Sequence, residues 1–277
     1  MFLVALGLVG LLFGVGSSEV RRFENSAARD ISSRLEGSAR QVKVRTKMDP
    51  FKAIGGHLKS ATLTASAFST SGLPFFTQPD GSQRGRLDEL KMQLSDFDLT
   101  GLHVKSLNVR IPDCRFDFGL AQRKGKVRLT KSGVGKGTVE VTEDALRDFV
   151  LKRSPAIQTM SVHLRDGLVE IDGQGKFGLF QARVRVSGRL VSPDGNLIEI
   201  VDAKAMIDET NATPETTALL LKQVNPVLDL DRELKLFGAL RVQKIELGGG
   251  ILRAEGVAIV PNEPSGTGLE TLGLILP

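Results

Sequence analysis

Apolar and polar residues alternate with a period of two through most of the chain after residue 38. The clearest case is Lys176–Leu190, which has one apolar side and one polar, mostly basic side. Because successive side chains of a strand point to opposite faces of a sheet, this segment predicts one long strand. The apolar set is Phe180, Ala182, Val184, Val186 and Leu190, and the polar set is Gln181, Arg183, Arg185, Ser187 and Arg189.

The same alternation predicts a body built mainly of strands. Connections such as Arg165–Gly167 and Gly248–Gly250 are rich in residues that tolerate tight turns. Short hairpins force antiparallel neighbours. The predicted strands are Gln41–Met48, Leu58–Phe68, Glu89–Leu99, Val104–Ile111, Lys126–Lys131, Gly137–Val141, Thr159–Leu164, Leu168–Gly173, Phe177–Val191, Leu197–Ile207, Leu240–Leu247 and Ile251–Val260.

Three segments have helical spacing instead. In Glu19–Glu36, apolar residues recur every three or four positions, which predicts an amphipathic helix. Thr142 is suited to cap a helix over Glu143–Arg153, whose first residues are acidic and favourable at the positive helix end. Thr213 opens a third helix, which ends at Pro226.

These elements predict an α+β fold in which a long, strongly curved antiparallel sheet wraps around a few amphipathic helices. Two or three slim helices do not fill such a half-pipe, so a tubular apolar cavity is expected to remain. The predicted organisation is a helix over residues 19–37, a single domain over 38–260 and a flexible tail over 261–277, which is rich in Gly and Pro.

Residues 1–16 carry no charge, and residues 1–18 are therefore predicted to be a signal or membrane-anchor segment. Two arginines follow this run and none precedes it, which by the positive-inside rule favours a cytoplasmic body. A basic segment upstream of this start would reverse that orientation. The expected location is at a membrane, on the periplasmic or outer side of the cytoplasmic membrane, with the cytoplasmic side left open.

The composition favours an apolar interior and an anionic partner. The chain of 277 residues has 14 Phe but no Trp or Tyr, so every aromatic ring is purely apolar. A compositional habit of the source genome explains this equally well. The net charge of +5 suits a phospholipid surface. Nucleic acid is disfavoured, because Lys and Arg are scattered along the strands and no Tyr or Trp can stack on bases.

No catalytic residue, metal site or cofactor is predicted. The Gly173–Gly178 segment fits a dinucleotide-binding pattern, but no helix follows it to receive a pyrophosphate. The three histidines are isolated, and no metal-ligand spacing occurs. Cys114, the one cysteine, is expected to be a buried, inert thiol. The sequence therefore argues for a binding protein and against an enzyme.

One loop stands out within Gly72–Gly81. Leu73, Phe75 and Phe76 lie between turn-forming residues, so they could project from a loop tip. Exposed, they would insert shallowly into a membrane or guard the mouth of a cavity. Folded back, they would plug the core.

The segment Lys126–Val260 resembles the LmeA-like family of bacterial phospholipid-binding cell-envelope proteins. The resemblance is in the stretches "GKVRLTKSGVGKGTVEVTEDALRDFVLKR", "VHLRDGLVEIDGQGKFG", "ARVRVSGRLVSPDGNLIEI" and "LRVQKIELGGGILRAEGVAI". These are patterns of strands and turns and not catalytic signatures. The resemblance implies a fold like that of tubular lipid-binding proteins, a membrane-linked location and binding of phospholipid without chemistry.

Together these observations predict a non-enzymatic, membrane-associated protein that binds phospholipid, with a role in lipid transfer or envelope maintenance. Its protein partners are not predicted. The alternative is an envelope scaffold with a packed core and a protein partner. The predicted cavity wall is Leu146, Phe149, Val150, Phe180, Val184, Val186, Leu219 and Leu220, and the predicted membrane-facing residues are Leu73, Phe75, Phe76, Arg183 and Arg185.

Overall fold

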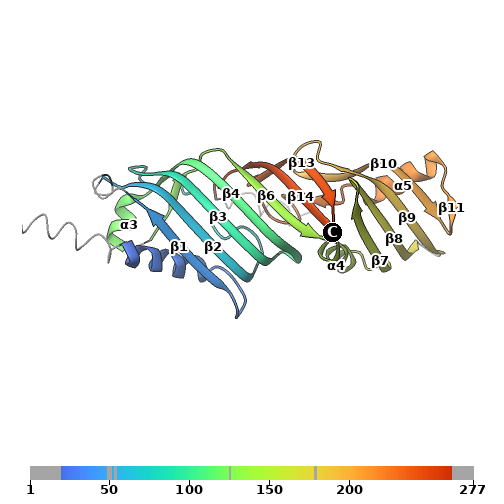
Figure 1. The fold of residues 1–277 in the computed structure, drawn as a ribbon, viewed down its shortest axis with the longest axis horizontal. Coiled ribbons are helices and arrows are strands. Elements are labelled where there is room, and N and C mark those ends of the chain that lie inside the picture. The colour runs from blue at the N-terminus through green and yellow to red at the C-terminus, as the bar shows by residue number, and fades with distance from the viewer. Residues whose placement is uncertain (1–19, 49–51, 53–54, 125, 178–179, 264–277) are drawn as a thin grey trace, which may run out of the picture.

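The computed structural model describes residues 20–48, 52, 55–124, 126–177 and 180–263. These residues form the expected α+β fold, in which two sheets follow one another along the long axis of the molecule (Figure 1). Neither sheet closes on itself. The wrapping of a sheet into a tube stays a prediction. The segment predicted as a signal or anchor lies outside the described residues, as does most of the predicted tail.

The first sheet has eight strands in the order β1-β2-β3-β4-β6-β14-β13, with β5 paired to β4. Its strands are β1 (Gln41–Lys47), β2 (His57–Thr70), β3 (Gly85–Leu99), β4 (Leu102–Phe116), β5 (Leu129–Lys131), β6 (Gly135–Thr142), β13 (Leu240–Gly248) and β14 (Ile251–Ala258). Because β13 and β14 return to β6 from the far end of the chain, the second sheet is inserted between strands of the first.

The second sheet has six strands in the order β11-β10-β9-β8-β7, with β12 paired to β10. Its strands are β7 (Ile157–Arg165), β8 (Leu168–Phe177), β9 (Phe180–Val191), β10 (Leu197–Ile207), β11 (Thr210–Asn211) and β12 (Leu228–Asp229). The predicted strand Phe177–Val191 therefore begins too early, because Phe177 still belongs to β8 and pairs with Phe180 of β9.

The expectation of purely antiparallel neighbours is wrong at one place, since β2 and β3 are parallel. Parallel neighbours cannot be joined by a tight hairpin, because the chain must first return along the strand. Residues 71–84 make this return, and we call them the crossover segment. Its 14 residues can span roughly 46 Å when extended, which is also the length of a 14-residue strand such as β2.

Several long strands contain an irregular residue. Asp96 in β3 and its neighbour Ala67 in β2 both have positive φ, and both are skipped in the pairing register. Asp202 in β10 also has positive φ, where the register with β9 shifts. An extra residue in a ladder bends a strand and increases its twist. Only Asp202 lies at such an extra residue and is therefore expected to bend β10, since Ala67 and Asp96 are skipped together and leave the register of β2 and β3 unshifted.

The helices have the caps that the sequence predicts. Thr142 accepts a hydrogen bond from the Ala145 amide at the start of α4 (Glu143–Arg153). Thr213 does the same for the Thr216 amide at the start of α5 (Pro214–Val224). The N-terminal helix covers residues 20–32, and a short helix that the sequence did not predict, α3, spans Phe118–Lys124.

The two sheets join where hairpin turns meet. The Gly167 amide donates to the Leu247 carbonyl (3.1 Å), and the Gly250 amide donates to the Leu164 carbonyl (3.3 Å). Glu143, at the start of α4, accepts a hydrogen bond from the Leu164 amide (3.0 Å) and donates its own amide to Gly250. The inner faces of the two sheets, toward which the helices pack, therefore meet beside α4.

Candidate functional site

The larger cavity runs along the inner faces of both sheets and has a volume of about 1520 Å3, including its open mouth. Its wall draws on β3, β4, β6, β13 and β14 of the first sheet and on β7–β10 of the second. Every residue that lines it is Leu, Ile, Val, Met, Phe, Ala or Pro. A hollow with this lining has no partner for a polar ligand group and suits hydrocarbon.

Helix α4 closes one side of this cavity. Leu146, Phe149 and Val150 all line it, because residues three and four apart share one face of a helix. Phe149 is 4% exposed, whereas Leu146 and Val150 are half-buried. The Arg153 guanidinium lies 5.0 Å from the centre of the Phe149 ring, at the solvent end of the helix. The three predicted residues of α4 are thus brought together on the wall.

The smaller cavity, about 1040 Å3 including its opening, lies beneath the N-terminal helix. Phe23, Ala27 and Ile31 of that helix face residues of β1–β4 such as Leu63 and Phe116. Unlike the larger cavity, it also has polar wall residues: Asp30, Arg34, Thr46, Gln78, Arg128 and Glu263. This cavity can therefore accept a ligand with a charged or hydrogen-bonding part.

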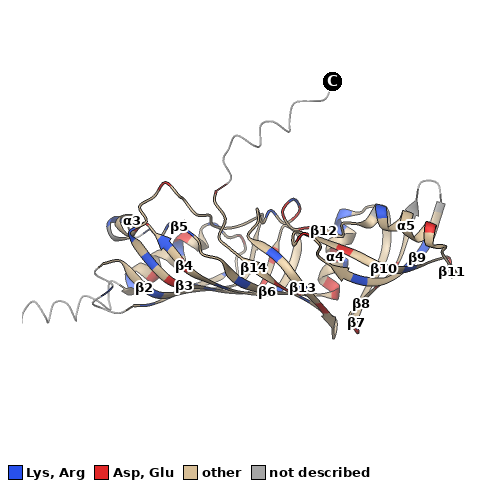
Figure 2. Cartoon of the chain, turned by 90° about the horizontal axis from the view of Figure 1, so that it is seen from above, with Lys and Arg blue, Asp and Glu red and all other residues tan. Residues whose placement is uncertain are grey.

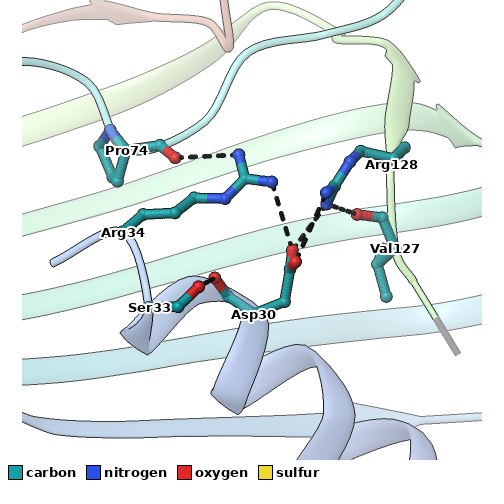
Figure 3. A network of polar contacts seen from close by, with 6 residues as sticks. All are labelled: Asp30, Ser33, Arg34, Pro74, Val127 and Arg128. Carbon is teal, nitrogen blue, oxygen red and sulfur yellow. Dashed lines mark hydrogen bonds and ion pairs between the residues drawn. The ribbon is translucent and has the colours of Figure 1, made fainter.

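Asp30 is the centre of a group that we call the inner triad, Arg34–Asp30–Arg128 (Figure 3). Arg128 donates to both Asp30 oxygens, at 2.6 and 3.4 Å, and Arg34 donates at 3.4 Å. The hydrogen bond from Arg128 lowers the pKa of Asp30, and the charges of both arginines lower it further. The triad itself carries one net positive charge, and Glu263, the other charged residue of the cavity wall, offsets it.

The crossover segment separates the two cavities. Phe75 lines both of them, Leu73 lines the larger and Phe76 lines the smaller. All three side chains are half-buried. Phe76 packs edge-on against Phe237, with 5.8 Å between the ring centres. The sequence left open whether this segment projects from a loop tip or folds back on the core. In the structure, the segment lies against the inner face of the sheet.

Hydrogen bonds fasten the crossover segment near its middle. The Thr77 amide donates to the Pro261 carbonyl (2.8 Å), and the Glu263 amide donates to the Thr77 carbonyl (3.2 Å). The Gln78 amide donates to Leu129 of β5 (2.7 Å), and Arg34 of the inner triad donates to the Pro74 carbonyl (3.3 Å; Figure 3). The segment is thus held from three parts of the chain.

The remaining predicted wall residues lie further out along the second sheet. Val184 and Val186 are half-buried on the inner face of β9 and line neither cavity, whereas Leu190 on the same strand lines the larger one. On α5, Leu220 is half-buried and Leu219 is 62% exposed, and neither lines a cavity. The side chain of Phe180 is outside the described part of the structure.

Arg183 and Arg185 lie on the outer face of the second sheet and share a carboxylate. Both donate to Asp172, with closest distances of 2.8 and 2.7 Å, and each arginine side chain is 53% exposed. Hydrogen bonds from Arg183 and then Arg185 lower the pKa of Asp172 to about 2. We call this group the outer triad, Arg183–Asp172–Arg185; it repeats the chemistry of the inner triad away from both cavities.

Sequence reasoning missed most of the larger cavity wall and the whole inner triad. The alternation marked Val104, Val109 and Leu252 as apolar strand residues, but an alternating pattern does not separate cavity wall from packed core. Asp30 and Arg128 are 98 residues apart and join through tertiary packing alone. The only local signal was the helical spacing that placed Asp30 beside Ile31 on the N-terminal helix.

Other polar candidates have structural roles. His57 is hydrogen-bonded to Asp88 (2.8 Å), and Asp231 accepts hydrogen bonds from the Gly238 amide and from Arg241. Cys114 is 0% exposed, and burial raises the pKa of its thiol, as expected for an inert residue. Within the described residues, no group of three His, Cys, Asp or Glu side chains could hold a metal ion.

Residues 69–257 match the model of the LmeA-like phospholipid-binding family. Because this match covers more than half of the chain, the protein belongs to that family, which is a family of binding proteins. No curated protein and no solved structure matches the chain. Among the helices that the structure describes, none is both long and apolar enough to span a membrane.

Proposed function

We propose that this member of the LmeA-like phospholipid-binding family binds one phospholipid, with acyl chains in the larger cavity and the headgroup at the smaller one. The observation that carries the proposal is the wall of the larger cavity, which is apolar throughout. The two cavities meet at Phe75, so a single amphiphile has both an apolar and a polar compartment within reach.

Acyl chains would supply most of the binding free energy. Transfer of hydrocarbon from water into an apolar site contributes roughly 0.8 kcal/mol per methylene group. An apolar cavity also gives water no hydrogen-bond partners, so the entering chain displaces little bound water. Retention of a lipid therefore needs few polar contacts.

The inner triad would select the headgroup. Arg34 and Arg128 both line the smaller cavity, and their charge exceeds that of Asp30. Guanidinium groups bind phosphate oxygens in a planar, bidentate manner, so a phosphodiester is a suitable third partner. The arrangement would therefore select a phosphate-bearing headgroup, whatever else that headgroup carries.

The proposed cellular role is lipid transfer or envelope maintenance by a membrane-associated protein without enzymatic activity. We place it on the periplasmic or outer side of the cytoplasmic membrane, in keeping with the cell-envelope proteins that the chain resembles. A reporter fused to the C-terminus tests the side of the membrane. The scaffold alternative requires a filled interior, and the hollow along both sheets supports the binding role instead.

The decisive experiment fills the cavity and measures lipid. Protein purified without detergent is extracted with organic solvent, and the extract is analysed by mass spectrometry. Ala254, which is 3% exposed and lines the larger cavity, is replaced by Phe. We expect the Ala254→Phe variant to lose most co-purified phospholipid while its free energy of unfolding stays within about 1 kcal/mol of the unmodified chain, because the ring enters empty space.

Ala65→Phe is the matched control. Ala65 is 1% exposed and lines neither cavity, so its replacement by Phe overpacks a filled region and should cost about 1–3 kcal/mol. An unmodified chain that carries no lipid and captures none from phospholipid vesicles would contradict the proposed function.

A further inference from the structure

Basic side chains form a row across the outer face of the eight-stranded sheet. Directly paired residues of neighbouring strands point to the same face, and the pairing registers connect β1, β2, β3, β4 and β6. The successive partners across these strands are Arg45, Thr62, Lys91, Arg110 and Lys136. With about 4.8 Å between strands, the row is roughly 19 Å long.

A second row runs beside the first, and together we call them the basic face. Its successive partners are His57, Arg86, Arg115 and Lys131, on β2, β3, β4 and β5. Lys43 and Lys47 extend the basic face along the edge strand β1, because they alternate with the cavity-lining residues Val44 and Thr46. Lys and Arg recur in blue along the strands at this end of the molecule (Figure 2).

The positive charge of this face is largely uncompensated. Its acidic residues are Asp88, Glu89 and Asp113, which pair with Arg86 and Lys91. Among the described residues, no carboxylate forms an ion pair with Arg45, Arg110, Arg115, Lys131 or Lys136. The Lys and Arg of the basic face thus exceed its Asp and Glu by six, compared with a net charge of +5 for the whole chain.

We propose that the basic face docks on the surface of an anionic phospholipid bilayer. Lys and Arg side chains near such a surface are attracted by its negative potential, and their contributions add. The inner face of the same strands lines both cavities, so docking would hold the lipid site beside the membrane. A nucleic acid is the less suitable partner, because the chain has no Tyr or Trp to stack on bases.

The test measures anion-dependent vesicle binding by the full chain. Sedimentation with vesicles of phosphatidylcholine alone and of phosphatidylcholine with 30% phosphatidylglycerol gives a ratio of two affinities, and this ratio cancels any contribution of apolar insertion. Each basic residue contributes about fivefold at low ionic strength. We expect the Arg45→Gln, Arg110→Gln, Lys136→Gln triple variant to lower the ratio more than tenfold.

The matched control neutralises the same number of charges on the other sheet. Arg165, Arg189 and Lys204 are exposed on strands β7, β9 and β10, and their replacement by Gln should leave the ratio within twofold. Equal losses in both variants would show an effect of net charge alone and would overturn the proposal, as would no loss in either. Tighter binding to a DNA duplex than to the anionic vesicles would also overturn it.

Two further measurements keep the result interpretable. If the triple variant does not fold, the unmodified chain must lose its preference for anionic vesicles by 0.5 M salt, where screening is strong; a preference that persists contradicts the proposal. Mass spectrometry of co-purified lipid separates this proposal from the preceding one. If both proposals hold, the triple variant keeps its cavity lipid. If only the proposed function is wrong, the unmodified chain carries no lipid but still binds anionic vesicles.

Discussion

The two sheets share one inner-face chemistry but differ in what lies on their outer faces and in how fully they are covered. In the eight-stranded sheet, the inner face is covered by the N-terminal helix and the crossover segment, and the outer face is basic from β1 to the start of β6. In the six-stranded sheet, the outer face alternates arginines with carboxylates, as in the outer triad. The alternating pattern gives both sheets an apolar inner face. The pairing register of the strands then determines which charged side chains lie next to one another on the outer face.

Coverage also changes along the molecule. Ile111 of β4 is 0% exposed, whereas the inner-face residues Val184, Val186 and Ile207 at the far end of the second sheet are only half-buried. The buried residues of the second sheet include Val162 and Leu164 beside α4, and also Ile198, Ile200 and Ala205 of β10. The second sheet thus has buried positions of its own but leaves several inner-face residues at its far end half-buried.

The largest expected effect tests this contrast with one substitution at two places. Ile111→Ala should lower the free energy of unfolding by about 2–5 kcal/mol, because it removes a fully buried side chain from a packed region. Ile207→Ala, at the half-buried end of β10, should cost less than about 1.5 kcal/mol. Urea denaturation with unchanged m-values measures both. Equal costs would mean that the far end is as well covered as the first sheet.

The next effect separates the two triads. Arg128→Gln removes the main donor to Asp30 inside the smaller cavity, and a hydrogen bond to a charged group contributes about 1.5–3 kcal/mol. Affinity for phosphatidylglycerol should therefore fall about tenfold or more. Arg183→Gln makes the same change in the outer triad, remote from both cavities, and should alter lipid affinity less than twofold. Competition against a fluorescent phospholipid measures both, and equal losses would contradict headgroup selection by the inner triad.

The smallest effect concerns pH. The pKa of Asp172 is lowered to about 2 from its ordinary 3.8, so its ion pairs stabilise the folded state above pH 4 and this contribution is lost as the pH falls toward 2. Because the arginines are half-exposed, solvent screens the pairs and Asp172→Asn should cost less than about 1 kcal/mol at pH 7. The difference from the unmodified chain should disappear below pH 2. A difference that grows on acidification would show that the sign is wrong.

Much of the fold could be predicted from local pattern. The alternation located nearly every long strand, and Thr142 and Thr213 marked both helix starts correctly, because capping and amphipathicity are properties of neighbouring residues. The parallel pairing of β2 with β3 could not be predicted in this way. A 14-residue connection with turn residues is compatible with a long hairpin loop or with a crossover, and only packing against the sheet decides between them.

The site was less predictable than the fold, because it depends on which residues meet across the sheet. Leu146, Phe149 and Val150 share a helix face, which their spacing predicted, and all three line the larger cavity. Arg45, Lys91, Arg110 and Lys136 are scattered in the sequence and become a row only through strand register. For Arg183 and Arg185, the sequence showed that both lie on one face of a strand. It did not show that they share the carboxylate of Asp172 on the neighbouring strand.

The insertion of the six-stranded sheet between β6 and β14 has a consequence for biosynthesis. Thr142 of β6 pairs with Ile251 of β14, so the first sheet stays incomplete until β14 has been synthesised. Leu252 and Ala254, which line the larger cavity, are translated after every strand of the second sheet. A nascent chain therefore lacks part of the cavity wall until β14 has formed, and we expect acquisition of lipid to follow that step.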